Sequence, residues 1–225
     1  MAKYKKIFNK NSENLLIECF IRNFVRSVKK NEKQKKRFSF VLTGGSSPIN
    51  LYKKLAQKDI DWTNIDLFWG DERYVSNKSK HSNYKLVYKN LLKKIKIKKK
   101  QIFFIDTNKE SIVDSVINYE EKIKKYFRNK KRSFDLVLLG MGNDGHIASI
   151  FKDNLNIKLN KIATSVTRKD FQRISLTLKV INKAKNICLW LNDKKKTKVF
   201  KSFKIKKKIP VFNLKKSKLS IYLIS

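Results

Sequence analysis

The chain has 225 residues, of which 41% are hydrophobic, and this fits a single α/β domain over residues 1–225 with a sizeable core. No apolar run approaches the roughly 20 residues that a membrane-spanning helix needs, and no uncharged hydrophobic stretch follows the lysine-rich start, which excludes a secretory signal. We therefore expect a cytoplasmic protein without a membrane partner, and we also expect a monomer.

The chain is strongly basic, because 55 lysines and arginines stand against 18 acids and give a formal net charge of +37. One interpretation is nucleic-acid binding, for which a basic surface is the first requirement. The other is compositional bias, since lysine, asparagine and isoleucine are abundant, glycine is scarce, and the charge is spread over the whole length. We find no RNP-like, zinc-finger or helix-turn-helix motif, so we favour bias and expect no specific nucleic-acid partner. The charge should still attract anionic substrates and bind polyanions in a salt-dependent way.

The two cysteines, Cys19 and Cys188, lie in apolar surroundings. Free cysteines in such surroundings behave as small buried hydrophobic residues. We therefore expect a reducing compartment, and neither a disulfide nor a metal site.

The amino-terminal part predicts a strand, a helix and a second strand. Residues 3–8 are a candidate strand, and residues 12–30 carry apolar positions at helical spacing after Ser12, a candidate N-cap. A lysine-rich connection follows. Residues 38–42 then predict a strand that runs directly into the turn TGGSSP.

The TGGSSP turn is the first candidate binding element. Gly44 and Gly45 free the backbone amides, Ser46 and Ser47 offer hydroxyls, and Pro48 suits the start of the helix predicted after it. A strand, a glycine-serine turn and a helix N-terminus can together cradle a phosphate. It is not a Walker loop, because no Gly-Lys-Ser/Thr follows the glycines. Taken alone, the turn fits an ordinary capped turn equally well.

A second candidate element follows the strand predicted for residues 65–69. The segment GDER places Asp71, Glu72 and Arg73 directly after strongly apolar residues, so these charged groups emerge from the core. An arginine there can hold a phosphate or a carboxylate with two hydrogen bonds. The two acids can orient that arginine or bind sugar hydroxyls, although a solvated loop has the same composition. Ser82 is a candidate cap for a helix to about residue 95.

The third element is the stretch FDLVLLGMGNDGHIASIF, residues 134–151, around which the chain is organised. A basic connection, a short strand at 102–105 and a helix at 110–127 precede it. Its apolar run predicts a buried parallel strand, and the glycines after it permit a tight turn close to a ligand. We expect a helix to begin near His146 or Ile147, with Asp144 beside it. Glycine-rich turns of this kind are often purely structural, but His146 lies in a turn and not on an apolar face.

The carboxyl-terminal part continues the alternation of strands and helices. After a polar loop at 152–160, strands are predicted at 162–166, 173–178 and 186–191. The segment NDKKK opens a helix to residue 203, and residues 211–213 and 219–223 predict the last strands. The whole predicts a Rossmann-like, doubly wound and mostly parallel sheet with helices on both faces. Its right-handed crossovers would bring TGGSSP, GDER, GNDGH and NDKKK to one pocket.

The ordered set TGGSSPINLYKKL, IDLFWGDERYV with a later SNY, DLVLLGMGNDGHIASIF and RISLTLKVINKA resembles the 6-phosphogluconolactonases from about Phe38 onward. The resemblance implies a cytosolic hydrolase without a cofactor. Such an enzyme converts 6-phospho-D-glucono-1,5-lactone to 6-phosphogluconate in the pentose phosphate pathway. It also implies that the 6-phosphate lies against Gly44, Gly45, Ser46, Arg73, Arg173 and Lys195.

The nearest alternative is glucosamine-6-phosphate deaminase, which is similar in fold and loops. That family usually has DEY where this chain has Asp71-Glu72-Arg73, and FNEP after DGHIA, where this chain has SIF. The place of the deaminase glutamate falls at Phe151, so the lactonase is preferred. The chain departs from the lactonase pattern at Ile147, Lys152 and Asn192, where threonine, proline and glycine are usual.

Lactone hydrolysis needs an activated water, a stabilised oxyanion and a proton for the leaving ring oxygen. His146 is the candidate general base, because the ordinary pKa of histidine lies near working pH. Asp144 can orient it or shape the turn, and backbone amides of the glycine turns can stabilise the oxyanion. A second hypothesis is a basic nucleic-acid-binding protein that retains an enzyme fold, which would bind RNA or DNA even at physiological salt.

Overall fold

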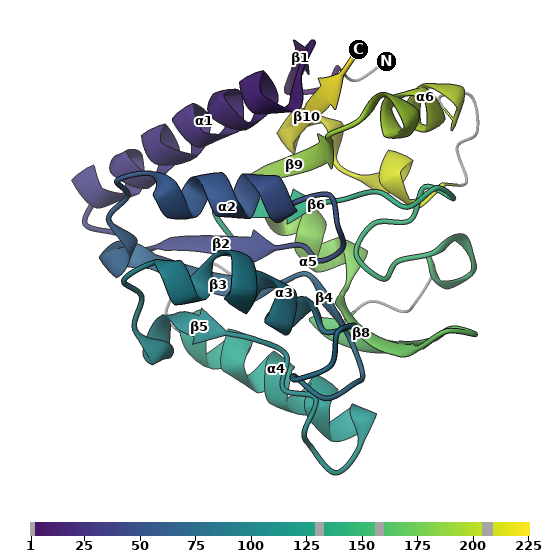
Figure 1. Cartoon of the computed structure of the whole chain (residues 1–225). Helices are drawn as coiled ribbons and strands as arrows, with labels where there is room; N and C mark the ends of the chain where they lie inside the picture. Colours follow the sequence, from purple (N-terminus) through teal and green to yellow (C-terminus); the bar gives the residue numbers. More distant parts are fainter. Residues whose placement is uncertain (1–2, 129–132, 156–159, 204–208) are drawn as a thin grey trace.

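The computed structural model describes residues 3–128, 133–155, 160–203 and 209–225 (Figure 1). In them a seven-stranded sheet has the order β1-β10-β9-β6-β2-β3-β5, and all of its neighbouring strands run parallel. The strands of this sheet are β1 (Lys6–Lys10), β2 (Phe38–Leu42), β3 (Ile65–Trp69), β5 (Ile102–Phe103), β6 (Leu136–Leu139), β9 (Asn186–Leu191) and β10 (Leu219–Ile224). The predicted parallel sheet is confirmed.

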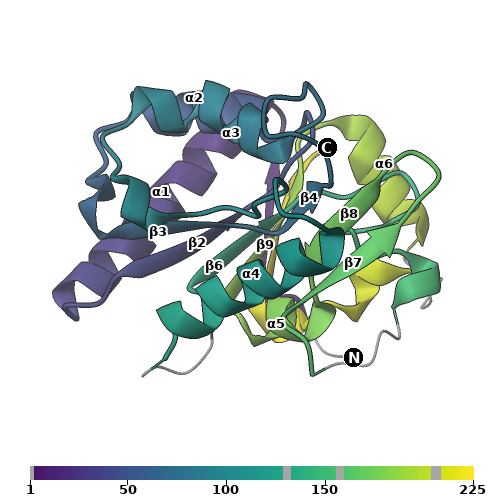
Figure 2. The ribbon, with the colours of Figure 1, turned by 90° about the horizontal axis from the view of Figure 1, so that it is seen from below.

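Helices cover both faces of this sheet, as predicted. Figure 2 shows α1, α2 and α3 on one face and α4 and α5 on the other. The helices are α1 (Glu13–Lys33), α2 (Ile49–Gln57), α3 (Asn83–Asn90), α4 (Ile112–Tyr126), α5 (Leu178–Lys183) and α6 (Lys194–Ser202). Because the faces are covered, strands β2 and β3 are buried along their whole length and read as continuous apolar runs. No helix in the described ranges is long and apolar enough to cross a membrane.

A second, three-stranded antiparallel sheet lies beside the first, in the order β4-β8-β7. Its strands are β4 (Asp71–Arg73), β8 (Gln172–Leu176) and β7 (Ala163–Thr167). The segments of β7 and β8 were predicted as strands, but the pairing of GDER with β8 was not. This pairing places Arg73 directly opposite Arg173, although the two lie far apart in the sequence.

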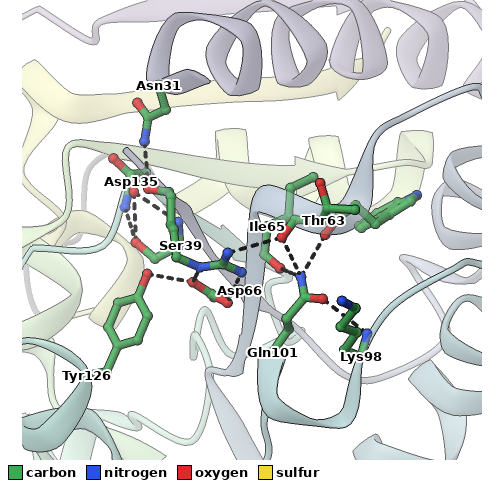
Figure 3. A network of polar contacts seen from close by, with 11 residues as sticks. Asn31, Ser39, Thr63, Ile65, Asp66, Lys98, Gln101, Tyr126 and Asp135 are labelled. Atoms are coloured by element: carbon green, nitrogen blue, oxygen red, sulfur yellow. Dashed lines mark hydrogen bonds and ion pairs between the residues drawn. The ribbon is translucent and has the colours of Figure 1, made fainter. Parts of the chain in front are cut away.

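The amino ends of β2, β3 and β6 are joined by buried acids with several partners each (Figure 3). Asp135 accepts hydrogen bonds from the backbone N and the Oγ of Ser39, both at 2.9 Å. Asp66 accepts two hydrogen bonds of 2.6 Å from Arg37 and one of 3.0 Å from the hydroxyl of Tyr126. Burial and the nearby Asp66 raise the pKa of Tyr126, which keeps this hydroxyl a donor. These bonds hold the strands at one end, and the loops at the other end form the site.

Two local predictions are wrong. No helix begins near His146 or Ile147, because Gly145 (φ 83°) and Ala148 (φ 46°) are left-handed and interrupt helical geometry. Instead Ile147 and Ile150 pair their backbones across a tight turn. Residues 211–213 form a 3₁₀ turn (Pro210–Asn213) and not a strand, because the proline lacks a donor and fixes φ.

Other bounds differ by a few residues. The helix predicted from Ser82 ends at Asn90, where a 3₁₀ turn (Leu92–Lys94) replaces it. The strand predicted at 102–105 is limited to two residues. Residues 156–159 of the predicted polar loop lie outside the described residues. Cys188 is buried and Cys19 half-buried, and both are free.

Candidate active site

A polar cleft opens at the carboxyl ends of β2, β3 and β6, where the sequence predicted a shared pocket. Residues of the predicted segments TGGSSP, GDER and GNDGH line it, and the fourth segment, NDKKK, contributes a single lysine. The described residues that line the cleft are Thr43, Gly44, Gly45, Ser46, Ser47, Asp71, Arg73, Asn83, Gly140, Met141, Gly142, His146, Ala148, Arg173 and Lys196. The cleft therefore combines one histidine and one carboxylate with three cations.

His146 and Asp144 form a close pair at one end of the cleft. The Nδ1 atom of His146 lies 2.5 Å from the Oδ1 atom of Asp144. Burial alone would raise the pKa of Asp144, but the charge and the hydrogen bonds of His146 outweigh it and lower that pKa. Because an ionised carboxylate can only accept, Nδ1 must carry the proton. In the neutral imidazole with the proton on Nδ1, the Nε2 atom has a free lone pair, as a general base requires.

The turn around His146 fits the imidazole ring closely. A Cβ atom at Gly142 would lie 2.1 Å from the Cε1 atom of His146 and 2.2 Å from its Nδ1. The backbone N–H of Gly142 donates to the carbonyl of His146 at 2.9 Å. The ring centroid of Phe151 lies 4.5 Å from that of His146. The imidazole therefore lies against Gly142, which leaves no room for a side chain, and packs on the ring of Phe151.

Two arginines from neighbouring strands occupy the cleft between β4 and β8. Arg73 donates from Nη1 to the backbone carbonyl of His81 at 2.8 Å, and Arg173 pairs with Asp170 at 2.5 Å. The Nε atoms of both arginines are buried and have no partner in the described part of the chain. Two guanidinium groups on directly paired residues of a polar cleft have the chemistry that suits an anion.

The glycine-serine turn forms another part of the cleft lining. Its Gly45 has φ 77°, a left-handed conformation that a side chain would strain. Tyr52 fixes the start of the turn, because its hydroxyl donates to the carbonyl of Thr43 at 2.7 Å. The Nζ atom of Lys196 contacts the hydroxyl of Ser47, and burial lowers the pKa of this lysine. Amides, hydroxyls and an ammonium group therefore converge here.

The structure brings Lys196 into the cleft and not the predicted Lys195, whose side chain is exposed. The reason is the start of α6, where Asp193 accepts a hydrogen bond of 2.7 Å from the backbone N of Lys196. This cap sets which residue of the first turn faces the cleft. Three consecutive lysines carry no signal of that choice in the sequence.

Glu72 does not line the cleft, although it was a candidate for binding sugar hydroxyls. It is 1% exposed and accepts from the backbone N atoms of Asn83 and Tyr84, each at 2.7 Å. Burial raises the pKa of Glu72 to about 7, although these hydrogen bonds favour the ionised form. The residue therefore anchors the start of α3. This helix in turn delivers Asn83 to the cleft, a residue to which the sequence gave no role.

In the ranges that the structure describes, no group of three His, Cys, Asp or Glu side chains could hold a metal ion. Arg168 lies outside the cleft lining, with its guanidinium 4.2 Å from the ring centroid of Phe151 and paired with Asp153.

Comparison with known proteins identifies relatives of the whole fold. The family described as glucosamine-6-phosphate isomerases/6-phosphogluconolactonase matches residues 11–222. The 6-phosphogluconolactonase of Nostoc sp. is 35% identical over 159 residues, which are 69% of this chain and 66% of that protein. The one from Thermotoga maritima is 30% identical over 182 residues, which are 80% of each chain.

Solved structures give the same result. The crystal structure of the Thermotoga maritima 6-phosphogluconolactonase matches with a TM-score of 0.86 at 25% identity, covering 97% of this chain and 98% of that one. The enzyme from Trypanosoma cruzi matches with a TM-score of 0.84 at 26% identity, covering 100% of this chain and 96% of that one.

Proposed function

The chain belongs to the glucosamine-6-phosphate isomerase/6-phosphogluconolactonase family, and we propose that it hydrolyses 6-phospho-D-glucono-1,5-lactone to 6-phosphogluconate. The single observation that carries this proposal is the His146–Asp144 pair at a cleft that three cations also line. A candidate base and a group of cations in one cleft match a lactone that carries a phosphate. We further propose that the reaction takes place in the cytoplasm.

The contact of Phe151 with His146 favours the lactonase over the deaminase. In the deaminase pattern a glutamate takes this position, but here an apolar ring packs against the imidazole with centroids 4.5 Å apart. The carboxylate partner of the histidine is Asp144 alone within the described residues. A histidine with one carboxylate and one free nitrogen suits the activation of water.

We assign the phosphate to the glycine-serine turn and the cations around it. Gly44, Gly45 and Ser46 supply amides and a hydroxyl, while Arg73 and Arg173 bring two guanidinium groups to the same cleft. Lys196 takes the part that the resemblance gave to Lys195, because only its Nζ atom reaches the turn. Asp71 also lines the cleft, and its remaining lone pairs can accept hydrogen bonds from sugar hydroxyls.

We propose His146 as the general base of the hydrolysis. Its Nε2 atom takes a proton from a water molecule, which attacks the lactone carbonyl carbon. The N–H of Met141 donates to no other residue in the described chain and is our candidate for stabilising the oxyanion. Collapse of the intermediate breaks the bond to the ring oxygen, which receives the proton from the imidazolium. Asp144 stabilises that imidazolium and fixes its tautomer.

The proposal is tested by measuring two reactions with the wild-type protein. The lactone is generated in situ, and acid release is followed above the spontaneous rate. In parallel, ammonia release from glucosamine 6-phosphate is measured. We expect fast hydrolysis and no deamination. Deamination without hydrolysis, or neither activity from a folded protein, would reject the proposed function.

A further inference from the structure

A buried network of hydrogen-bonded side chains, called the polar network below, connects the separate loops that line the cleft. Its centre is Asp71, whose Oδ2 atom accepts a hydrogen bond of 2.7 Å from the hydroxyl of Ser149. From the other side, Nδ2 of Asn83 donates to the backbone oxygen of Asp71 at 2.9 Å and to its Oδ1 atom at 3.3 Å. Asn83 is 1% and Ser149 0% exposed, so water does not compete for these bonds.

At one end, the polar network reaches the glycine-serine turn, to which we assign the phosphate. Because both partners of Nδ2 are acceptors, the amide orientation of Asn83 is determined, and its Oδ1 atom points away from Asp71. This side of the amide packs on Gly44, where a Cβ atom would lie 1.9 Å from Oδ1. The amide of Asn83 therefore fills the space that a side chain at position 44 would need, and it sets where the turn lies.

At the other end, the polar network reaches the turn that carries His146. Ser149 lies three residues after His146, and its backbone N donates to the hydroxyl of Ser175 on β8 at 3.2 Å. The backbone hydrogen bonds between Ile147 and Ile150 enclose Ser149 in a tight turn directly after His146. A displacement of Ser149 would therefore move the turn that carries the imidazole.

The buried carboxylate of Glu72 fixes the position of Asn83. Glu72 binds the backbone N atoms of Asn83 and Tyr84, and it accepts from the hydroxyl of Ser82 at 3.1 Å. These bonds tie the first turn of α3 to β4. Asn83 thus has little freedom to follow a displaced neighbour.

We propose that Asn83 and Ser149 are positioning residues that fix, through Asp71, the distance between the phosphate-binding turn and His146. This inference rests on the proposed lactonase activity. The phosphate is held at one end of the substrate, and the carbonyl must reach the base at the other. A misplacement of about 1 Å costs on the order of 10²-fold in rate, so the separation of the two ends matters.

The test is a double-mutant cycle with Ser149→Ala and Asn83→Ala, in which kcat and KM for the lactone are measured. Each single variant should lower kcat by about 10-fold or more, and KM should change less than about threefold, because the phosphate contacts remain. Since either substitution breaks the same polar network, the kcat of the double variant should be only a little lower than that of the slower single variant.

Matched controls come from α4, away from the cleft. Ser115→Ala removes a hydroxyl that is buried and has no hydrogen-bond partner among the described residues, and Asn118→Ala removes an amide whose oxygen likewise has none. Both should retain the wild-type kcat. If an alanine variant fails to fold, Ser149→Cys and Asn83→Leu nearly keep the side-chain size, weaken or remove the hydrogen-bond donor without adding a charge, and should show the same loss in kcat.

The inference is overturned if the losses of the two single variants multiply in the double variant, because the residues would then act independently. A rise in KM at unchanged kcat, or equal losses in the α4 controls, would also overturn it. An inactive wild type would reject the lactonase function and this inference with it. If the wild-type protein is active, the variants can reject the positioning role while the lactonase function stands.

Discussion

Replacing Gly142 by alanine should damage catalysis while leaving the fold intact. The new Cβ atom would lie 2.1 Å from Cε1 and 2.2 Å from Nδ1 of His146, so the ring must move by at least about 1.3 Å to reach ordinary contact. The ring can yield, because 29% of the His146 side chain is exposed. A shift of this size predicts a fall in kcat of about 10²-fold with KM nearly unchanged.

The assay compares lactone hydrolysis and the thermal midpoint of Gly142→Ala with those of Gly140→Ala. Gly140 lies two residues earlier, and a Cβ atom there would meet only the Oγ1 atom of Thr43, at 3.8 Å. This is an ordinary contact, so Gly140→Ala should lose far less activity than Gly142→Ala. Equal losses in the two variants, or full activity of Gly142→Ala, would refute the reasoning.

Three further predictions concern the partners of the site. Asp144→Asn should lower kcat at least about 10-fold, because the amide cannot stabilise the imidazolium; an unchanged kcat would remove the aspartate from the mechanism. Lys196→Ala should raise KM about 10-fold or more through the loss of a charged hydrogen bond, whereas equal KM values for Lys196→Ala and Lys195→Ala would contradict the assignment. For Glu72, burial raises the folded-state pKa to about 7 from its ordinary 4.5, so the folded state holds the proton more tightly. The free energy of unfolding of wild type, relative to Glu72→Gln, should therefore fall in denaturant titrations as pH rises from about 4.5 to above 7; a rise would mean that the hydrogen bonds outweigh burial.

The sheet could be predicted because its strands are long apolar runs with sharp ends. Residues 38–42 and 65–69 form strands with the predicted bounds, since TGGSSP and GDER end them abruptly. The meeting of their loops at one cleft follows from parallel topology. Most of the predicted site residues line this cleft, and Asp144 contacts the cleft residue His146, whereas Glu72 and Lys195 do not line it.

The remaining features depend on tertiary contacts that no local pattern carries. The conformation of Ala148 (φ 46°) removes the expected helix, although alanine favours helices. The choice between Lys195 and Lys196 depends on the hydrogen bond that caps α6 at Asp193. The role of Asn83 depends on the burial of Glu72, which the sequence suggested as a partner of Arg73 or of sugar hydroxyls.

The most direct test of the account compares the two histidines of the chain. His146→Ala should lower kcat for the lactone by about 10²–10⁴-fold with the fold intact. His81→Ala should retain full activity, because His81 is exposed and Arg73 contacts only its backbone carbonyl, which the substitution keeps. Undiminished turnover by a folded His146→Ala protein would contradict the central claim that this histidine activates the water.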